Sequence, residues 1–385
     1  MADLRSLYKL FEPALRPVGN AASFSNESWS VEVLAGRTVV TARVRLTNEA
    51  GDREVMVYDV RPELFLLSTQ PVDALQVQTD LRSTEPDVPP RPDRYWTAFV
   101  IKPHGHTELD IDITVEGQAH RGIYALCLLL HVELYGAEGL GQRIHHLILP
   151  IPDPAAPADP VWRPVGDGLA VAALRTHLLT PVDDPVAVAL RYAVPHAQPG
   201  DVLVIGESPL AIMQNRFRHP AEIAISPLTR RLCYFLSGRG SLGTAPGLQA
   251  LIDLVGTPRV VWALTKGLLA KLANRDGDFY RTAGEQSRLI DDVTGTLAPY
   301  DRFIVLGPAD AAGVTQAVHA ATGLEVAVVD ANDLGKVDVL ASTPGVDRAD
   351  LVAALRSNPA GNAAENTPLV LVRGNRSGVL RYPVG

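Results

Sequence analysis

The N-terminal third of the chain alternates apolar and polar residues with a period of two, and this pattern most constrains its fold. The segment "WSVEVLAGRTVVTARVRLTNEAGDREVMVYDVRPELFLLS" (residues 29–68) shows the alternation, with turns at residues 35–36 and 48–52. Similar stretches continue to about residue 150. Successive side chains of a β-strand point to opposite faces. About seven short strands separated by turns therefore predict an all-β, two-sheet sandwich of immunoglobulin-like type over residues 22–151, after an N-terminal segment of residues 1–21.

The pattern changes after a proline- and alanine-rich connector, "PDPAAPADPVWRPVGDG" (residues 152–168). From residue 169 to residue 385, apolar strand-like runs alternate with helical stretches, which predicts an α+β or α/β domain. Tandem order of strands and helices usually indicates a parallel sheet, but the pattern leaves the topology open. We expect strands at residues 200–208, 300–308, 324–333 and 367–375, and helices at residues 184–197, 246–256, 310–323 and 347–358. The stretch "RVVWALTKGLLAKL" fits either.

Composition excludes several classes of protein. The net charge of -8 argues against a general nucleic-acid binder. We find no run approaching the ~18 apolar residues of a membrane span, and the N-terminus lacks the apolar run of a signal peptide. The two cysteines make no disulfide framework, so we expect a cytoplasmic protein. Six of the ten histidines lie in the predicted sandwich, where we expect them to be solvated or hydrogen-bonded within the domain.

Polar side chains follow several strands of the second half. Glu207 and Ser208 end one strand, Asp330 and Asn332 end another, and Arg373 ends the last. Ligands of α/β sheets collect at the carboxyl ends of strands, and carboxylate and amide oxygens suit Mg²⁺ or Mn²⁺. The sequence therefore raises two alternatives for Asp330 and Asn332, which are metal ligands or turn formers.

Two further stretches are candidates for the same site. The loop "GRGSLGTAPG" (residues 238–247) is glycine-rich but lacks the lysine of a P-loop. The stretch "SRLIDDVTG" contains the adjacent carboxylates Asp291 and Asp292. Each pattern alone is more often a turn or a helix cap than a ligand site.

Three stretches resemble the coenzyme F-420 gamma-glutamyl ligase family. They are "LLTPVDDPVAVALRYAVPHAQPGDVLVIGES", "TGLEVAVVDANDLG" and "NTPLVLVRG", and the similarity spans about residues 177–375. The predicted sandwich lies outside it. The resemblance implies an α+β fold, usually dimeric, and an enzyme that extends a deazaflavin cofactor precursor with glutamate by using GTP and divalent metal ions.

The resemblance also implies roles for individual residues. Asp330 falls on the family's metal-binding aspartate with Asn332 beside it, and Asp291, with Asp292 as the alternate, falls on an earlier one. Arg373 falls on the arginine of the last strand. The family motif "xQKxxSKxEGR" is replaced by "GESPLAIMQNR", which retains only Arg216 and has Ile212 and Gln214 in place of a lysine and an acid.

We therefore expect a nucleotide- and metal-dependent amide ligase that joins an amino acid to a carboxylate through an acyl phosphate. Arg216 and Arg373 are candidate carboxylate or phosphate clamps. The expected cofactors are Mg or Mn with GTP or ATP, and the expected assembly is a homodimer, with a protein partner conceivable for the sandwich. The candidate nucleotide-binding residues are Glu207, Ser208, Gly240, Ser241, Gly243 and Lys266. The alternative is a catalytically silent ligase-fold protein that serves as a binding or scaffold module.

Overall fold

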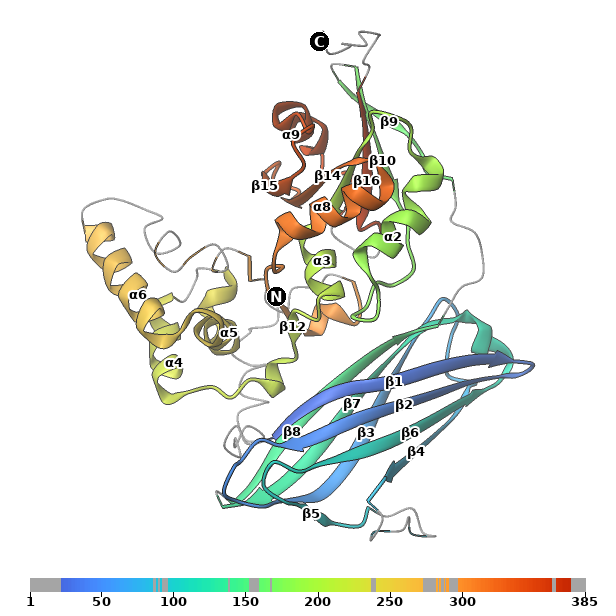
Figure 1. The fold of residues 1–385 in the computed structure, drawn as a ribbon, viewed down its shortest axis with the longest axis vertical. Coiled ribbons are helices and arrows are strands. Elements are labelled where there is room, and N and C mark those ends of the chain that lie inside the picture. The colour runs from blue at the N-terminus through green and yellow to red at the C-terminus, as the bar shows by residue number, and fades with distance from the viewer. Residues whose placement is uncertain are drawn as a thin grey trace. The chain divides into compact units, whose positions relative to one another are not determined.

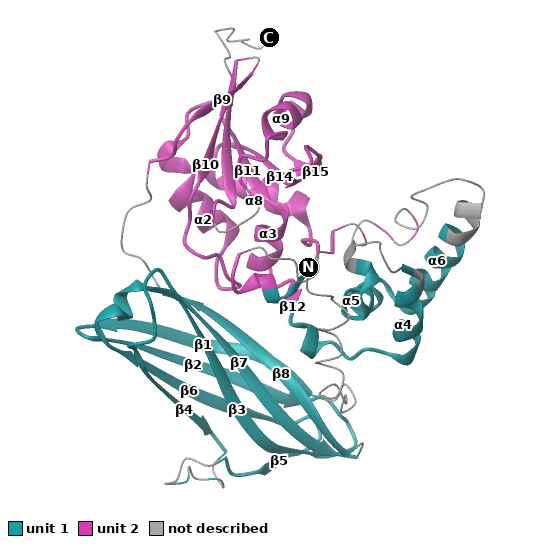
Figure 2. Cartoon of the chain, turned by 180° about the vertical axis from the view of Figure 1, so that it is seen from behind, with its two compact units in different colours: residues 1–153, 218–276, 302–304 teal, residues 154–217, 277–301, 305–385 magenta. Residues whose placement is uncertain are grey.

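The chain forms two compact units in a computed structural model (Figure 2). The sandwich unit comprises residues 1–153, 218–276 and 302–304, and the mixed-sheet unit comprises residues 154–217, 277–301 and 305–385. The structure describes residues 22–85, 88, 91, 96–137, 139–151, 159–166, 168–236, 240–272, 282, 284, 287, 289–290, 297–361 and 365–374.

Two antiparallel four-stranded sheets form the sandwich, as the alternating sequence predicts (Figure 1). One sheet has the order β1-β2-β6-β4 and the other β5-β3-β7-β8. The strands are β1 (Ala22–Leu34), β2 (Arg37–Asn48), β3 (Val55–Ser68), β4 (Gln76–Ser83), β5 (Phe99–Ile101), β6 (His106–Glu116), β7 (Ile123–Gly136) and β8 (Gly139–Pro150), with the 3₁₀ turn η1 (Gln118–Gly122) before β7.

Alternate side chains of β2 and β6, and the even-numbered residues 126–134 of β7, point into one shared apolar core. Val44 of β2, Ile111 of β6 and Leu128 of β7 are all at most 1% exposed and belong to the same core cluster. The intervening residues of β6 are polar and face outward, and so are those of β2 apart from the half-buried Val39. The alternation of apolar and polar residues in β2 and β6 therefore arises because each strand has one buried and one solvated face.

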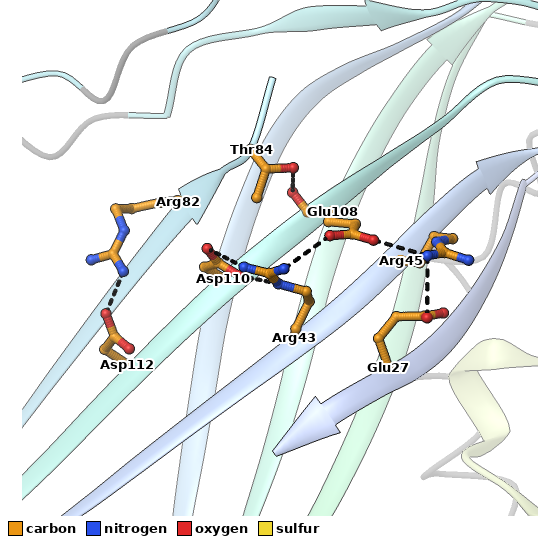
Figure 3. A network of polar contacts seen from close by, with 8 residues as sticks. All are labelled: Glu27, Arg43, Arg45, Arg82, Thr84, Glu108, Asp110 and Asp112. Carbon is orange, nitrogen blue, oxygen red and sulfur yellow. Dashed lines mark hydrogen bonds and ion pairs between the residues drawn. The ribbon is translucent and has the colours of Figure 1, made fainter. Parts of the chain in front are cut away.

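The outer face of the β1-β2-β6-β4 sheet carries a ladder of ion pairs (Figure 3). Arg43 lies directly opposite Asp110 and contacts it at 2.6 Å, and Arg45 lies opposite Glu108 and contacts it at 2.9 Å. The ladder continues to both neighbouring strands through pairs of Arg45 with Glu27 and of Arg82 with Asp112. Because the pairs are exposed, they add little stability, but opposite charges in directly facing positions favour this strand register over a shifted one.

A helical segment also belongs to the sandwich unit. It contains the 3₁₀ turn η3 (Pro220–Glu222), α4 (Pro227–Leu232), η4 (Cys233–Leu236), η5 (Gly240–Gly243), α5 (Ala245–Val255) and α6 (Thr257–Leu272). Ser226 and Thr244 cap α4 and α5 by accepting backbone N–H groups, and each helix has a proline in its first turn. The ambiguous stretch at residues 259–272 is thus helical. Gly256, with φ of 86°, separates α5 from α6.

The mixed-sheet unit is built on a six-stranded sheet with the order β15-β14-β11-β16-β10-β9 (Figure 1). Only β11 and β14 are parallel; the other neighbouring pairs are antiparallel. The topology that the sequence pattern left open is therefore mixed, because β14 and β15 are joined by a short hairpin and β16 runs against both of its neighbours. The strands are β9 (Arg163–Gly166), β10 (Leu169–Leu174), β11 (Val202–Gly206), β14 (Glu325–Ala331), β15 (Val337–Ser342) and β16 (Leu369–Gly374). Strand β9 lies within the stretch predicted as a connector.

Helices cover both faces of this sheet. The helices are α2 (Pro185–Tyr192), α3 (Glu207–Met213), α8 (Ala311–Thr322) and α9 (Arg348–Leu355), with η2 (Val194–His196) after α2. Successive residues of β11, β14 and β16 enter opposite core clusters, one shared with α2, α3 and α8 and the other with α9. Two-sided burial explains why these strands read as unbroken apolar runs. The expected strand at residues 300–308 is reduced to η7 (Tyr300–Arg302) and the two-residue β13 (Ile304–Val305), and Phe217–Arg218 form the equally short β12.

We expect Leu128→Ala to destabilise the sandwich by about 2–5 kcal/mol, because Leu128 is fully buried in its core and the surroundings cannot close the cavity completely. Leu140→Ala is the matched control, since Leu140 is 53% exposed. Urea unfolding followed by far-ultraviolet circular dichroism measures both. Equal unfolding midpoints for the two variants would contradict the assigned core.

Candidate functional site

The parallel pair β11 and β14 brings two of the predicted polar segments to the same end of the sheet, where both strands terminate. Gly206 lies opposite Val329 at the ends of the two strands. Glu207 and Ser208 begin α3 directly after β11. They therefore lie at the same end of the sheet as Asp330, which ends the apolar run of β14. Strand direction, rather than proximity in sequence, places these residues together.

Glu207 is a buried carboxylate, with 5% of its surface exposed. It is the first residue of α3, which starts directly after β11 without an intervening loop. Gly206 is required there by packing, because a Cβ would lie 3.1 Å from the ring of Pro209 and 3.4 Å from the carbonyl oxygen of Pro368. The small residue at this strand end thus has a local structural reason.

Asp330 faces a second carboxylate that sequence analysis missed. Asp338 of β15 is its direct Cα partner across the hairpin, and Lys336 Nζ lies 3.9 Å from Asp338 Oδ2. Asp338 was overlooked because β15 was not predicted. The signal was available in the short alternation of "KVDVLAS". Like charges in facing positions repel, and the ammonium group of Lys336 offsets part of this repulsion.

Asn332 shapes the turn of the same hairpin. Its Oδ1 accepts hydrogen bonds from the backbone N–H groups of Leu334 at 3.0 Å and Lys336 at 3.3 Å. Gly335 occupies the left-handed region with φ of 75°. Both lone-pair directions of the amide oxygen are used within the turn, so a metal ion would have to compete with these bonds. Metal binding by Asn332 stays a prediction.

Arg373 lies at the opposite end of the sheet, beside the start of β11. Because β16 is antiparallel to β11, Val372 pairs with Val202, and Arg373 meets Asp201 just before β11 begins. Its guanidinium donates two hydrogen bonds to Asp201, at 2.9 and 2.7 Å, and lies 3.8 Å from the centre of the Trp162 ring. The hydrogen bond to Asp201 raises the pKa of Arg373. Arg373 and Asp330 therefore lie at opposite ends of the sheet, and the role of Arg373 as a carboxylate or phosphate clamp stays a prediction.

The segment after α3 uses its polar side chains to hold backbone. Arg216 Nε donates to the carbonyl oxygen of Gly307 at 2.5 Å, and burial lowers the pKa of Arg216. The Gln214 amide both donates to and accepts from the backbone of Ala309, each at 2.7 Å. Ile212 is buried. The positions at which this chain departs from the ligase motif thus have structural roles here.

The remaining candidates lie elsewhere. Gly240 and Gly243 bound η5 with Ser241 between them, and the exposed Lys266 lies on α6, all within the sandwich unit. Asp291 and Asp292 lie outside the residues that the structure describes. Among the described residues, no group of three or more His, Cys, Asp or Glu side chains is arranged to hold a metal ion. Nor does that part of the chain contain a helix with the length and apolarity needed to cross a membrane.

A hydrogen-bonded triad underlies the start of α2. His177 contacts the hydroxyl of Tyr192 through Nδ1 at 2.7 Å and Asp183 through Nε2 at 2.8 Å. Asp183 also accepts from the backbone N–H and the hydroxyl of Thr180. Asp184 caps the helix by accepting the N–H of Ala187. The adjacent aspartates of this stretch therefore divide into one network residue and one N-cap.

The sandwich matches a known family. Residues 23–153 match the family model described as F420-0:gamma-glutamyl ligase, N-terminal Ig-like domain. The Ig-like fold expected for this region is confirmed. The expectation that the sandwich lies outside the ligase resemblance is wrong, because the match falls on the sandwich and not on the C-terminal half.

Other similarities are remote. The GAE domain of yeast GGA1 is 8% identical, with a TM-score of 0.20 over 35% of this chain and 96% of that one. A protein from Archaeoglobus fulgidus is 9% identical, with a TM-score of 0.19 over 34% and 99% of the two chains. The GAE domain of GGA2p from Saccharomyces cerevisiae is 11% identical, with a TM-score of 0.19 over 34% and 98%. These values support no functional conclusion. No curated protein matches the chain.

We expect Arg373→Ala to lower the free energy of unfolding by at least about 1–3 kcal/mol, because it leaves the carboxylate of Asp201, which is 2% exposed, without its charged partner. Arg373→Lys should be intermediate, since an ammonium cannot reproduce the two-pronged pair. Arg356→Ala, at an exposed position after α9, is the control. Thermal unfolding of the three variants decides the role, and no loss in Arg373→Ala would refute a structural ion pair.

Proposed function

We propose that the chain is a nucleotide- and divalent-metal-dependent ligase of the gamma-glutamyl type. The observation that supports it most is the match of residues 23–153 to the N-terminal Ig-like domain of gamma-glutamyl ligases. The motifs of about residues 177–375 resemble the same family independently. Two separate regions of one chain thus point to one activity.

The reaction proposed is amide bond formation in two transfers. A carboxylate oxygen of the acceptor attacks the γ-phosphorus of GTP or ATP, and the nucleoside diphosphate leaves. The amine of an amino acid then attacks the acyl carbon of the resulting acyl phosphate, phosphate leaves, and the amine loses a proton. The protein's task is to position three substrates and to offset the charge of the phosphates.

The proposed active site lies at the C-terminal ends of β11 and β14, together with the start of α3 and the neighbouring β15. The facing carboxylates Asp330 and Asp338 supply oxygen donors of the kind that Mg²⁺ or Mn²⁺ prefers. Asp291 or Asp292 would complete the donor set, as the family resemblance implies. A metal bound here would neutralise charge on the nucleotide phosphates. We assign Asn332 to the turn that presents Asp330.

The nucleotide contacts are proposed from the resemblance and from residue type. Ser208 and Glu207 lie at the same end of the sheet as Asp330. Gly240, Ser241, Gly243 and Lys266 remain candidates for phosphate contact, as does Arg216 for charge pairing. A homodimer is the proposed assembly.

Incubation of the protein with GTP or ATP, Mg²⁺ or Mn²⁺, and a panel of carboxylates and amino acids should release phosphate and nucleoside diphosphate. Release should require all three substrates, because phosphate leaves irreversibly only after the amine attacks. Phosphate assay and mass spectrometry of the amide product measure this. Silence across a broad panel would contradict the ligase proposal.

Replacement of Asp330 by Asn should abolish metal-dependent nucleotide binding and leave the fold intact. An anionic ligand is lost, yet repulsion with the facing Asp338 is also relieved, so stability without metal should stay equal or rise slightly. Asp350→Asn, at an exposed position of α9, is the control. Calorimetric titrations with nucleotide and Mn²⁺ test both, and matching titrations for wild type and Asp330→Asn would remove Asp330 from the site.

A second candidate function is a catalytically silent ligase-fold module that binds a partner. The specific support is that Gln214 and Ile212, which replace an acid and a lysine of the ligase motif, bridge backbone and fill the core. The same calorimetry separates the two functions. A silent module binds neither nucleotide nor metal, whereas a ligase binds nucleotide more tightly when metal is present.

A further inference from the structure

A carboxylate–histidine pair joins the helical segment to strand β8 within the sandwich unit. His146 of β8 contacts Glu222 of η3, with 2.6 Å between Nδ1 and Oε1. The two side chains are only 10% and 16% exposed. The second oxygen of Glu222 accepts the backbone N–H of His219 at 3.2 Å. Glu222 therefore holds both the strand and the start of its own turn.

His219 completes this junction only while its ring is neutral. Its Nδ1 accepts the backbone N–H of Ala221 at 3.3 Å, and together with the Glu222 contact this forms a reciprocal cap of η3. A ring nitrogen that accepts a hydrogen bond carries no proton. Protonation of His219 would therefore break the cap. The rings of His219 and His146 both pack edge-on against Phe303.

His145, the neighbour on β8, adds a second neutral ring. Its Nε2 lies 2.8 Å from Oδ1 of Asn26, and its ring stacks on Phe24 with 4.8 Å between the ring centroids. The rings of His145 and His146 are 5.9 Å apart. A positive charge on His145 would lie between an aromatic face and another histidine, and that histidine disfavours the charge.

The electrostatic surroundings favour this neutral state. Burial lowers the pKa of His219; Glu222 and Glu63 oppose the shift, and His146 and His131 add to it. Burial, with a contribution from His146 and against that of Glu222, lowers the pKa of His145 to about 3. Burial acts to raise the pKa of Glu222, but the charge of His146 and its hydrogen bond outweigh this, and the pKa is lowered.

We propose that His219, Glu222 and His146 form a proton-operated latch that keeps η3 and the adjoining α4 attached to β8 at neutral pH and releases them in mild acid. The facing titratable groups are His145 and His146 of β8, His131 of β7, Glu63 of β3 and Glu222 of η3. The function of the latch is to make the position of the helical segment depend on pH, whatever reaction the mixed-sheet unit performs.

The direction of the pH dependence follows from these shifts. Below the ordinary histidine pKa of 6.5, the released state takes up protons at His219 and His145 that the attached state does not. The attached state therefore loses stability as the pH falls below about 6.5. Because the pKa of Glu222 is lowered in the attached state, the released state takes up a further proton at Glu222 as the pH falls below the ordinary glutamate value of 4.5. Attachment is strongest above the histidine range and weakens steadily toward acid.

Hydrogen exchange of the full chain, read by mass spectrometry at about pH 7.5 and about pH 5, tests the latch. After correction for intrinsic exchange, peptides covering residues 219–232 should exchange several-fold faster at about pH 5 than at about pH 7.5, because the attached state loses stability in acid. Peptides from β2 and α8 should keep their protection. Unchanged protection at residues 219–232, or equal loss in all peptides, overturns the proposal.

The decisive variant is His219→Asn. The asparagine oxygen occupies the place of Nδ1 and caps the turn but does not titrate, so the acid-induced loss of protection should shrink several-fold while protection at neutral pH stays. His106→Asn, at an exposed position of β6, should behave like the wild type. A pH response in His219→Asn equal to that of the wild type removes His219 as the titrating group and overturns the latch.

Discussion

Burial of apolar side chains on both faces of the six-stranded sheet decides where chemistry can lie in the mixed-sheet unit. Residues of β11, β14 and β16 enter the two core clusters alternately, which leaves no place for a charged group within the strands. Polar side chains are therefore confined to the strand ends. Strand direction then selects which of them share an edge.

In the β1-β2-β6-β4 sheet of the sandwich, by contrast, only one face is buried against a core. The inward faces of the two sandwich sheets are apolar, and the outward face of the β1-β2-β6-β4 sheet is lined by arginines paired with carboxylates. A one-residue shift of β2 against β6 would bury Arg43 and Arg45 and expose Val44. The same strand periodicity thus gives one buried face in this sheet and two buried faces in the sheet of the other unit.

Local signals predicted local structure well. The period of two gave the sandwich, and the aspartates Asp184, Asp310 and Asp347 mark helix starts because each accepts backbone N–H groups of the following turn. Strand β15 was missed because it is short and follows a turn-rich stretch. Helix α3 was missed because no loop separates it from β11.

The relative placement of site residues was less predictable. An apolar run such as "LVLV" of β16 fits a parallel or an antiparallel position in the sheet equally well. Its sequence therefore does not reveal that Arg373 and Asp330 lie at opposite ends of the sheet. Asn332 illustrates a second limit, since an amide oxygen serves a turn and a metal equally well. Only the two backbone N–H groups beside it show that the turn uses it.

The junction between β8 and η3 has a consequence for synthesis. His146 and Glu222 are 76 residues apart in sequence, and ribosomes add roughly 5–20 residues per second. The strands of the sandwich therefore emerge roughly 4–15 s before the segment that covers this flank of β8. The nascent sandwich must stay folded and unaggregated through that interval, a demand that the finished molecule no longer displays.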